Sequence, residues 1–407
     1  MTPPPDFPLG PDRDPDDDPF RGVPLFGDLA RMLNQQLGQP GFGPRDTARQ
    51  FAVQVATGGQ SESNVDPLVR IRLEELARVA ELHVTQVTGL QVPTTGTALV
   101  EPVTRTRWVA RTLDDHRELL EALSSSLATP PAESDEPTDP SDPFAMFAPL
   151  MELMGPMMVG LATGSMVGNL ARRSFGQYDL PIPRPSGEPV LLVPTTIDEF
   201  ASDWSLPADD VRLWVCIHEL AHHAVLDVPH VRARLGHLLL AYASGFDPGA
   251  ADLSDRLGSL DPEQLGDPSA MAGLLGSPDV ILGALRSPAQ DALVPDLEAV
   301  VAVVVGFVDH VMDTIGAGLF GDYAQLTEAL RRRRVEASDA DRFVERLLGL
   351  EMTQACYDRG RRFIDGVVER AGAEALARLW DEERNLPTPA EIDAPGLWLA
   401  RIDLPLD

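Results

Sequence analysis

Apolar residues recur along much of the chain with the three-to-four-residue spacing of amphipathic helices. Residues 66–91 and 111–128 show this spacing, and so do residues 205–226, where the pattern continues without a breaker from a helix start at Pro207 to Leu226. The best strand candidate is a short β-branched run at 187–197, bounded by proline and glycine. The pattern therefore predicts a mainly α fold with a few short strands.

One uncharged stretch, residues 153–170, is long enough to raise the question of a membrane helix. Pro156 and the lack of aromatic anchors oppose a membrane span. Gly160, Gly164 and Gly168 follow one another at four-residue intervals, which places them on one helical face that a second helix can approach closely. We expect a tightly packed core helix rather than a membrane-spanning or interfacial one.

Local composition predicts two segments outside the folded part of the 407-residue chain. Residues 1–24 are acidic and proline-rich, lack the basic and apolar regions of a secretory signal, and are expected to be disordered. An acidic stretch at 130–143, rich in proline and serine, is expected to be a linker or loop insertion.

The overall charge restricts the class of partner. The chain has 33 basic residues, all arginine, against 63 acidic ones, a net charge of −30. This balance opposes a nucleic-acid partner and makes an anionic membrane surface unfavourable, because phosphate groups require clustered positive charge. The only cysteines, Cys216 and Cys356, are too few for a disulfide framework, which predicts a reducing, cytoplasmic location.

The segment with the clearest chemistry is His218-Glu219-Leu220-Ala221-His222, an H-E-x-x-H motif. Two histidines four residues apart lie one turn apart on one helical face, so both imidazoles can reach a single ion. Zn²⁺ prefers such nitrogen ligands and, in catalytic sites, keeps one position open for water. Glu219 is the predicted general base for that water. The sequence therefore predicts a zinc site with His218 and His222 as ligands.

The residues around the motif leave the third ligand open. The extended H-E-x-x-H-x-x-G-x-x-H pattern requires glycine and histidine where this chain has Val225 and Val228. His223 lies about 100° from the ligand face, which favours a supporting or surface role over ligation. Cys216 points away from the same face and is expected in the core. We expect the third ligand to be a carboxylate from another helix.

Together with this motif, several segments resemble the zincin-like metallopeptidase family, once described as a domain of unknown function. Some of its members are associated with deazaflavin-coenzyme biosynthesis or are labelled as hydrolases. The resemblance extends over residues 25–405 and so implies one folded domain. It also implies a mostly helical zincin-like fold and metal-dependent hydrolysis of an undefined peptide or protein substrate. The resembling segments are residues 171–183, 191–201, 213–226, 297–313, 330–363 and 379–402.

One departure from the family concerns the third ligand. Relatives are expected to carry glutamate immediately before the glycine of the segment VVVGFVDHVMD, where this chain has Val305. Asp309 lies one turn further along the helix and is the favoured replacement, with Glu351 and Glu298 as alternatives. Loss of the third ligand would weaken metal binding, so a catalytically degenerate binding or scaffold protein is the alternative to a zinc peptidase.

Two further features favour ordinary structural roles. The basic run Arg331–Arg334 is expected to be a solvated helix face or a counter-charge for the acidic body. Tyr178 and Asp179, in the segment GQYDLP, are expected to pack a turn, although tyrosine can also donate to a developing oxyanion.

Overall fold

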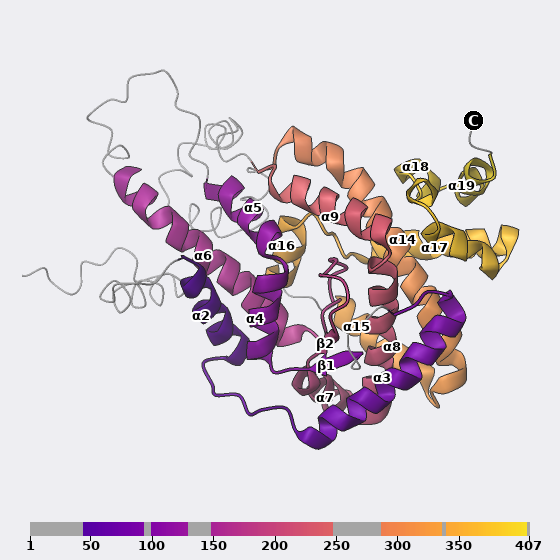
Figure 1. Ribbon diagram of the computed structural model, residues 1–407, viewed down its shortest axis with the longest axis horizontal. Helices are drawn as coiled ribbons and strands as arrows, with labels where there is room; N and C mark the ends of the chain where they lie inside the picture. The colour runs from indigo at the N-terminus through magenta and orange to yellow at the C-terminus, as the bar shows by residue number, and fades with distance from the viewer. Residues whose placement is uncertain (1–43, 93–98, 129–147, 247–285, 336–338, 405–407) are drawn as a thin grey trace, which may run out of the picture. The chain divides into compact units, whose positions relative to one another are not determined.

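The computed structural model describes residues 44–92, 99–128, 148–246, 286–335 and 339–404. The predicted tail at 1–24 and the predicted linker at 130–143 lie outside these ranges. Within them the mainly α prediction is confirmed, since helices account for most of the described backbone (Figure 1). The helices are α2 (Pro44–Thr57), α3 (Pro67–Thr88), α4 (Arg105–Asp115), α5 (Arg117–Ala128), α6 (Ala148–Arg173), α7 (Pro194–Asp203), α8 (Ala208–Leu226), α9 (Pro229–Ala243), α14 (Pro288–Leu319), α15 (Tyr323–Val335), α16 (Asp339–Leu347), α17 (Gln354–Ala371), α18 (Pro389–Ile392) and α19 (Pro395–Ile402), with 3₁₀ turns at Ala373–Trp380 and Glu383–Asn385.

The predicted helix at 66–91 is confirmed as α3, and its ends follow from its sequence. The Asp66 carboxylate accepts the N–H of Leu68 at 2.8 Å, and Gly89 closes the helix in the left-handed conformation that glycine adopts without strain. The helical spacing predicted over 111–128 is confirmed but is divided between two helices, because α4 ends at Asp115 and α5 begins at Arg117.

A small sheet supports the centre of the molecule. β1 (Val100–Pro102) and β2 (Val190–Leu192) are parallel, with Val100 opposite Val190. The predicted strand at 187–197 is thus confirmed only in its middle: β2 ends at Leu192, and α7 begins at Pro194. Gly176 forms an antiparallel bridge to Leu192 on the other side of β2, which brings the segment 174–184 against the sheet.

Helix α8, which carries the H-E-x-x-H motif, lies in the core. It packs against α3, α7, α9 and α14, and its residues Val215, Cys216 and Ile217 are fully buried. Cys216 is therefore a core residue, as predicted. At the start of α8 the Arg72 guanidinium of α3 binds the Asp209 carboxylate at 2.9 Å, so the two helices are also joined at the surface.

Close backbone approaches at glycine position two more helix pairs. A Cβ on Gly164 or Gly168 of α6 would lie 2.5 or 2.7 Å from a carbonyl oxygen of α2, so the predicted close packing on this glycine face is confirmed. In the same way, a Cβ on Gly306 of α14 would lie 2.4 Å from the backbone of Gly360 in α17. None of the helices in the described ranges combines the length and apolar character needed to cross a bilayer.

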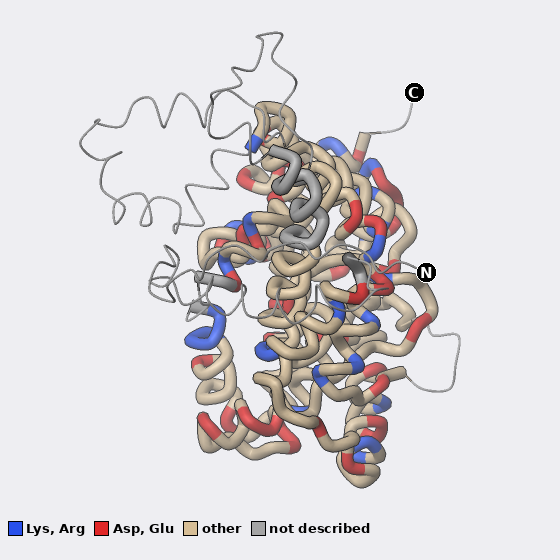
Figure 2. Tube along the Cα trace, turned by 90° about the vertical axis from the view of Figure 1, so that its left-hand side faces the viewer, with Lys and Arg blue, Asp and Glu red and all other residues tan. Residues whose placement is uncertain are grey.

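Acidic and basic residues are interspersed along the trace of the described helices (Figure 2). Many of them form surface ion pairs such as Arg212 with Asp198 and Arg378 with Asp403. Each such pair contributes little to stability, because water and salt screen it.

Candidate active site

The two histidines of the motif converge as their spacing predicts. The ring centroids of His218 and His222 are 4.4 Å apart, and both side chains line one polar pocket with a volume of about 50 Å³. His222 is buried, whereas His218 is about 13% exposed and stacks on Trp214. The pocket therefore gives two imidazoles access to one small space.

Local hydrogen bonds determine which ring nitrogens are available. Nδ1 of His222 lies 3.1 Å from the carbonyl oxygen of His218, which can only accept, so Nδ1 donates and Nε2 keeps its lone pair. Nδ1 of His218 lies 3.2 Å from Oε1 of Glu219, and an ionised Glu219 leaves Nε2 of His218 free in the same way. Burial, reinforced by the Arg334 cation, lowers the pKa of His218 to about 4. Burial also holds the pKa of His222 well below its usual value, so both rings are neutral at pH 7.

Glu219 occupies a different environment. Its carboxylate is fully buried, and Oε2 accepts the backbone N–H groups of Gln177 at 2.8 Å and Tyr178 at 2.9 Å. These bonds favour the ionised form, but burial outweighs them and, with the nearby Asp179 charge, raises the pKa of Glu219 to about 8. A Cβ on Gly176 would lie 2.4 Å from Oε2, so this enclosure requires glycine there. In this conformation Glu219 does not line the histidine pocket.

The predicted third ligand is engaged elsewhere. Both oxygens of Asp309 accept from Arg334, at 3.0 and 3.3 Å. Glu298 lies near Arg359, and Glu351 lies in the loop before α17 rather than on the helix that the sequence suggested. Among the residues that the structure describes, no three of the His, Cys, Asp and Glu type are grouped closely enough to hold a metal ion.

The basic run Arg331–Arg334 divides between two environments. Arg331 and Arg332 are exposed and pair with Glu328, as expected for a solvated face. A solvated face is wrong for Arg333 and Arg334, which line the histidine pocket and act as the counter-charges of Asp179 and Asp309, the other role expected for the run. Arg333 lies over the Phe175 ring and donates to the Arg173 carbonyl, whereas Arg334 lies over the Tyr357 ring. Their positions follow α15, whose buried residues Leu326, Ala329 and Leu330 precede Arg333 and Arg334 at helical spacing.

Comparison with known proteins adds an independent finding. The model of the zincin-like metallopeptidase family matches residues 45–399. The chain belongs to this family. A crystal structure from Chloroflexus aurantiacus, described as that of a candidate hydrolase with a novel fold, is similar with a TM-score of 0.60 at 22% identity, covering 89% of this chain and 99% of that one. No protein in the curated set matches.

Membership of the zincin-like metallopeptidase family implies a metal ion, which the side chains of this site would have to bind. The two neutral imidazoles have their Nδ1 atoms engaged, and with Glu219 ionised both Nε2 atoms are available and fit the nitrogen ligands of zinc. Asp309 is not assembled beside them, since Arg334 holds both of its oxygens. The two histidines of this zincin-like site therefore fit a metal ion, whereas Asp309 is not positioned to serve as the third ligand.

Tyr178 and His223 support the site from behind. Their side chains are joined by a 2.8 Å hydrogen bond between the phenol oxygen and Nδ1, and both are buried. The backbone N–H of Tyr178 meanwhile donates to Glu219. His223 is thus placed to support the site rather than to bind a metal, and Tyr178, expected to pack a turn, contacts both His223 and Glu219.

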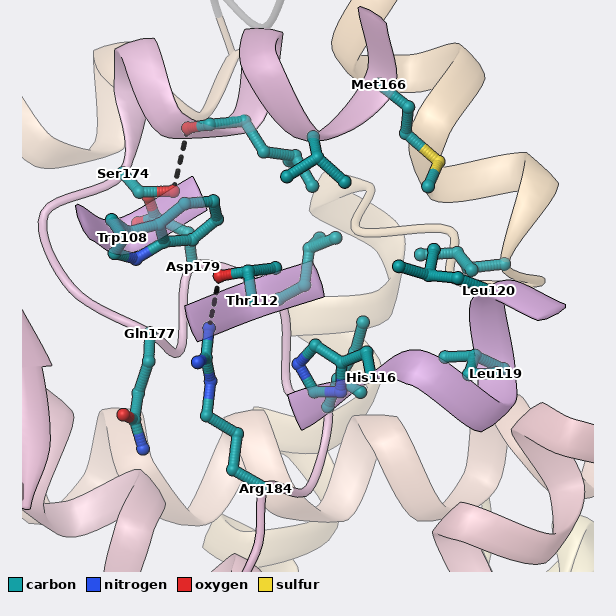
Figure 3. Close-up of a pocket in the computed structure, with 15 residues that line it drawn as sticks. Trp108, Thr112, His116, Leu119, Leu120, Met166, Ser174, Gln177, Asp179 and Arg184 are labelled. Carbon is teal, nitrogen blue, oxygen red and sulfur yellow. Dashed lines mark hydrogen bonds between the residues drawn. The ribbon is translucent and has the colours of Figure 1, made fainter. Parts of the chain in front are cut away.

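A second, mostly apolar cavity of about 40 Å³ adjoins the same segment, and Figure 3 shows its lining. Asp179 borders both cavities. Within the apolar one, Arg184 donates to Thr112 at 2.9 Å and to Asp115 at 2.8 Å, while Trp108, Leu120 and Met166 form part of its walls. The segment 174–184 of this zincin-like protein thus separates two cavities of opposite character.

Proposed function

We propose that the protein is a zinc-dependent hydrolase that cleaves peptide bonds, with His218 and His222 as metal ligands and Glu219 as general base. The observation that carries this proposal is the pair of neutral imidazoles lining one pocket, with Nε2 of His222 available and Nε2 of His218 available when Glu219 is ionised. Membership of the zincin-like metallopeptidase family supports the hydrolytic class. When bound, zinc would supply Lewis-acid polarisation of the substrate carbonyl and a lowered pKa for water.

The protein's own groups contribute orientation and proton transfer. The His218 carbonyl and the Glu219 carboxylate fix the two rings, which reduces the cost of ordering them on ligand binding. A carboxyl group with a pKa of about 8 can both accept and return a proton near neutral pH. To act on a group in the histidine pocket, the Glu219 carboxylate must give up its hydrogen bonds from the N–H groups of Gln177 and Tyr178 and turn toward that group.

The enclosure of Glu219 also favours a second candidate function. Its carboxylate is bonded to backbone N–H groups, and Asp309 is bonded to Arg334, so neither faces the histidine pocket freely. A degenerate zincin that binds a metal or a peptide without cleaving it would keep this arrangement. The two functions differ in what Glu219 does.

Zinc analysis of the purified full-length protein, combined with Glu219→Gln, tests the proposal. We expect about one zinc per chain, retained in the variant, and loss of peptide-library cleavage by at least about 100-fold. Glu118→Gln, on the exposed face of α5, is the control and should leave cleavage unchanged. Absence of zinc from the wild type would overturn the zinc assignment, and cleavage by Glu219→Gln at the wild-type rate would remove Glu219 from the mechanism.

A further inference from the structure

Helix α3 has apolar side chains on two opposite faces. Leu73, Ala80 and Val84 are buried on the face that packs against the body of the protein, α8 included. The outer face exposes Leu68 and Leu82, at 75% and 71%. Of the seven large hydrophobic side chains that are exposed within the described residues, five belong to this one helix. A surface helix normally has a polar outer face, so this concentration indicates a surface that another protein chain covers.

Four of these side chains form one stripe along the helix. At about 100° per residue, they fall within about 80° of one another around the helix axis, and the stripe is about 21 Å long. They are Leu68, Ile71, Val79 and Leu82. This is the shape of a seam between two helices, so a single helix of a partner is enough to cover it.

The order of residues along the stripe is self-complementary. Two charged residues, Glu75 and Arg78, interrupt it, and their midpoint along the helix is also the midpoint between Ile71 and Leu82. In an antiparallel pair of α3 helices with a twofold axis at this midpoint, Ile71 faces Leu82 of the second copy and Glu75 faces Arg78 of the second copy. A parallel pair would instead place like charges opposite each other, so the sequence of the stripe favours the antiparallel arrangement.

Both charged side chains of the stripe are accessible to a partner. Glu75 is 53% exposed, and its bond to Arg72 of the same helix, at 3.2 Å, uses only Oε2. Arg78 is exposed, and within the described ranges no acidic side chain forms an ion pair with it. Exposed ion pairs add little binding energy, so the contribution of these charges is to select the orientation of the two helices.

We propose that the exposed face of α3 binds the same face of a second copy of this chain and forms an antiparallel, twofold-symmetric dimer. Ile71 and Leu82 of the two copies bury each other, and the two pairs of Glu75 with Arg78 lie beside the axis. Because one helix from each copy makes the contact, the interface is at the low end of interface sizes, below about 1,200 Å², and we expect a dissociation constant on the order of 10 µM. This inference concerns assembly and does not depend on the proposed peptidase activity.

Sedimentation equilibrium of the full-length protein tests the dimer. Concentrations from about 1 to 100 µM bracket the expected dissociation constant, and about 0.15 M salt screens the repulsion between two acidic chains. Leu82→Gln removes an apolar side chain that enters the interface twice, so it should weaken the dimer at least about tenfold. Leu397→Gln is the matched control, because Leu397 on α19 is 59% exposed, and it should change the dissociation constant less than about twofold.

Charge reversals test the antiparallel register. Glu75→Arg and Arg78→Glu each bring like charges together across the axis, so each variant alone should dimerise at least about tenfold more weakly than the wild type. In an equal mixture of the two variants every charge again faces its opposite, and a mixed dimer should form with about the wild-type affinity. All of these positions are exposed, so the variants should fold, which far-UV circular dichroism checks.

Three results would overturn the proposal. A wild type that remains monomeric at the highest concentration would leave this face to another segment of the chain or to a different protein. A dimer as tight in Leu82→Gln as in the wild type would lie on another surface. A dimer that Leu82→Gln weakens but that neither charge reversal affects would refute the antiparallel register.

Discussion

The two cavities on either side of the segment 174–184 contain similar residue types in different arrangements. Each is lined by histidine and arginine side chains, and in each burial lowers a histidine pKa, to about 3 for His116 and about 4 for His218. In the apolar cavity the Arg184 guanidinium binds Thr112 and Asp115 among leucine and methionine side chains. In the polar one, two imidazoles converge on a shared space.

This difference shows that a shifted pKa does not by itself mark a functional site. Burial shifts the pKa of any ionisable group, and structural ion pairs occupy buried positions as readily as catalytic groups do. What distinguishes the polar pocket is that two neighbouring imidazole rings line one volume, beside a larger cavity that shares lining residues with it. The following predictions test that separation.

The largest expected effect is on metal affinity. His222→Ala should weaken zinc binding by at least about 1,000-fold, because it removes one of only two aligned imidazoles. His116→Gln changes the histidine of the apolar cavity and should leave the zinc affinity unchanged. Competition with a chromophoric chelator measures both values. An equal loss of zinc affinity in the two variants would contradict the proposal that the polar pocket, and not the apolar cavity, binds zinc.

The next effect is on stability and belongs to the apolar cavity. Arg184→Leu leaves the largely buried Asp115 carboxylate without its closest cation, which should cost about 3 kcal/mol of unfolding free energy. Urea unfolding measures the loss. Zinc affinity should be retained wherever the variant is folded, and a variant as stable as the wild type would contradict a structural role for this pair.

A smaller loss is expected from the segment between the cavities. In Gly176→Ala the new methyl group would meet the Glu219 carboxylate, so we expect a destabilisation of about 2 kcal/mol. Gly236→Ala in α9 is the control, since a Cβ there meets no atom within 4 Å and should slightly stabilise the helix. If thermal unfolding shows that both substitutions stabilise the protein, the enclosure of Glu219 is not tight.

The last effect, no larger than that expected for Gly176→Ala, concerns pH. The unfolded chain binds a proton at His116 below about pH 6.5, whereas burial and the Arg184 cation hold the folded pKa at about 3. Stability is therefore lost as pH falls through this window, and His116→Gln should lose about 2 kcal/mol less than the wild type between pH 7 and pH 4. Urea unfolding at a series of pH values tests this, and parallel curves for the two proteins would refute it.

Much of the helical fold and the histidine pair could be predicted because both depend on local spacing. The i, i+4 separation of His218 and His222 places them on one face whatever surrounds the helix. The break at His116 could not be predicted in this way, because apolar spacing alone does not determine where adjacent helices separate.

Other parts of the site left little trace in the sequence. The N–H groups that hold Glu219 belong to the backbone of Gln177 and Tyr178, and nearly every residue has such a group. Four successive arginines look alike by composition, so only the packing of α15 separates the inward Arg333 and Arg334 from the outward pair. The sequence therefore predicts which side chains can bind a metal or a proton. It does not predict which backbone N–H groups hold them or which arginines face the pocket.

The contact between Gly306 and Gly360 has a consequence for engineering. Because these backbones meet without room for a methyl group, any larger residue at either position must push α14 and α17 apart. Val305 and Asp309 lie on the same helix, so such a substitution would also move every position from which α14 could offer a carboxylate to the histidines. A designer who wishes to build a complete three-ligand centre should keep both glycines fixed and vary the residues around them.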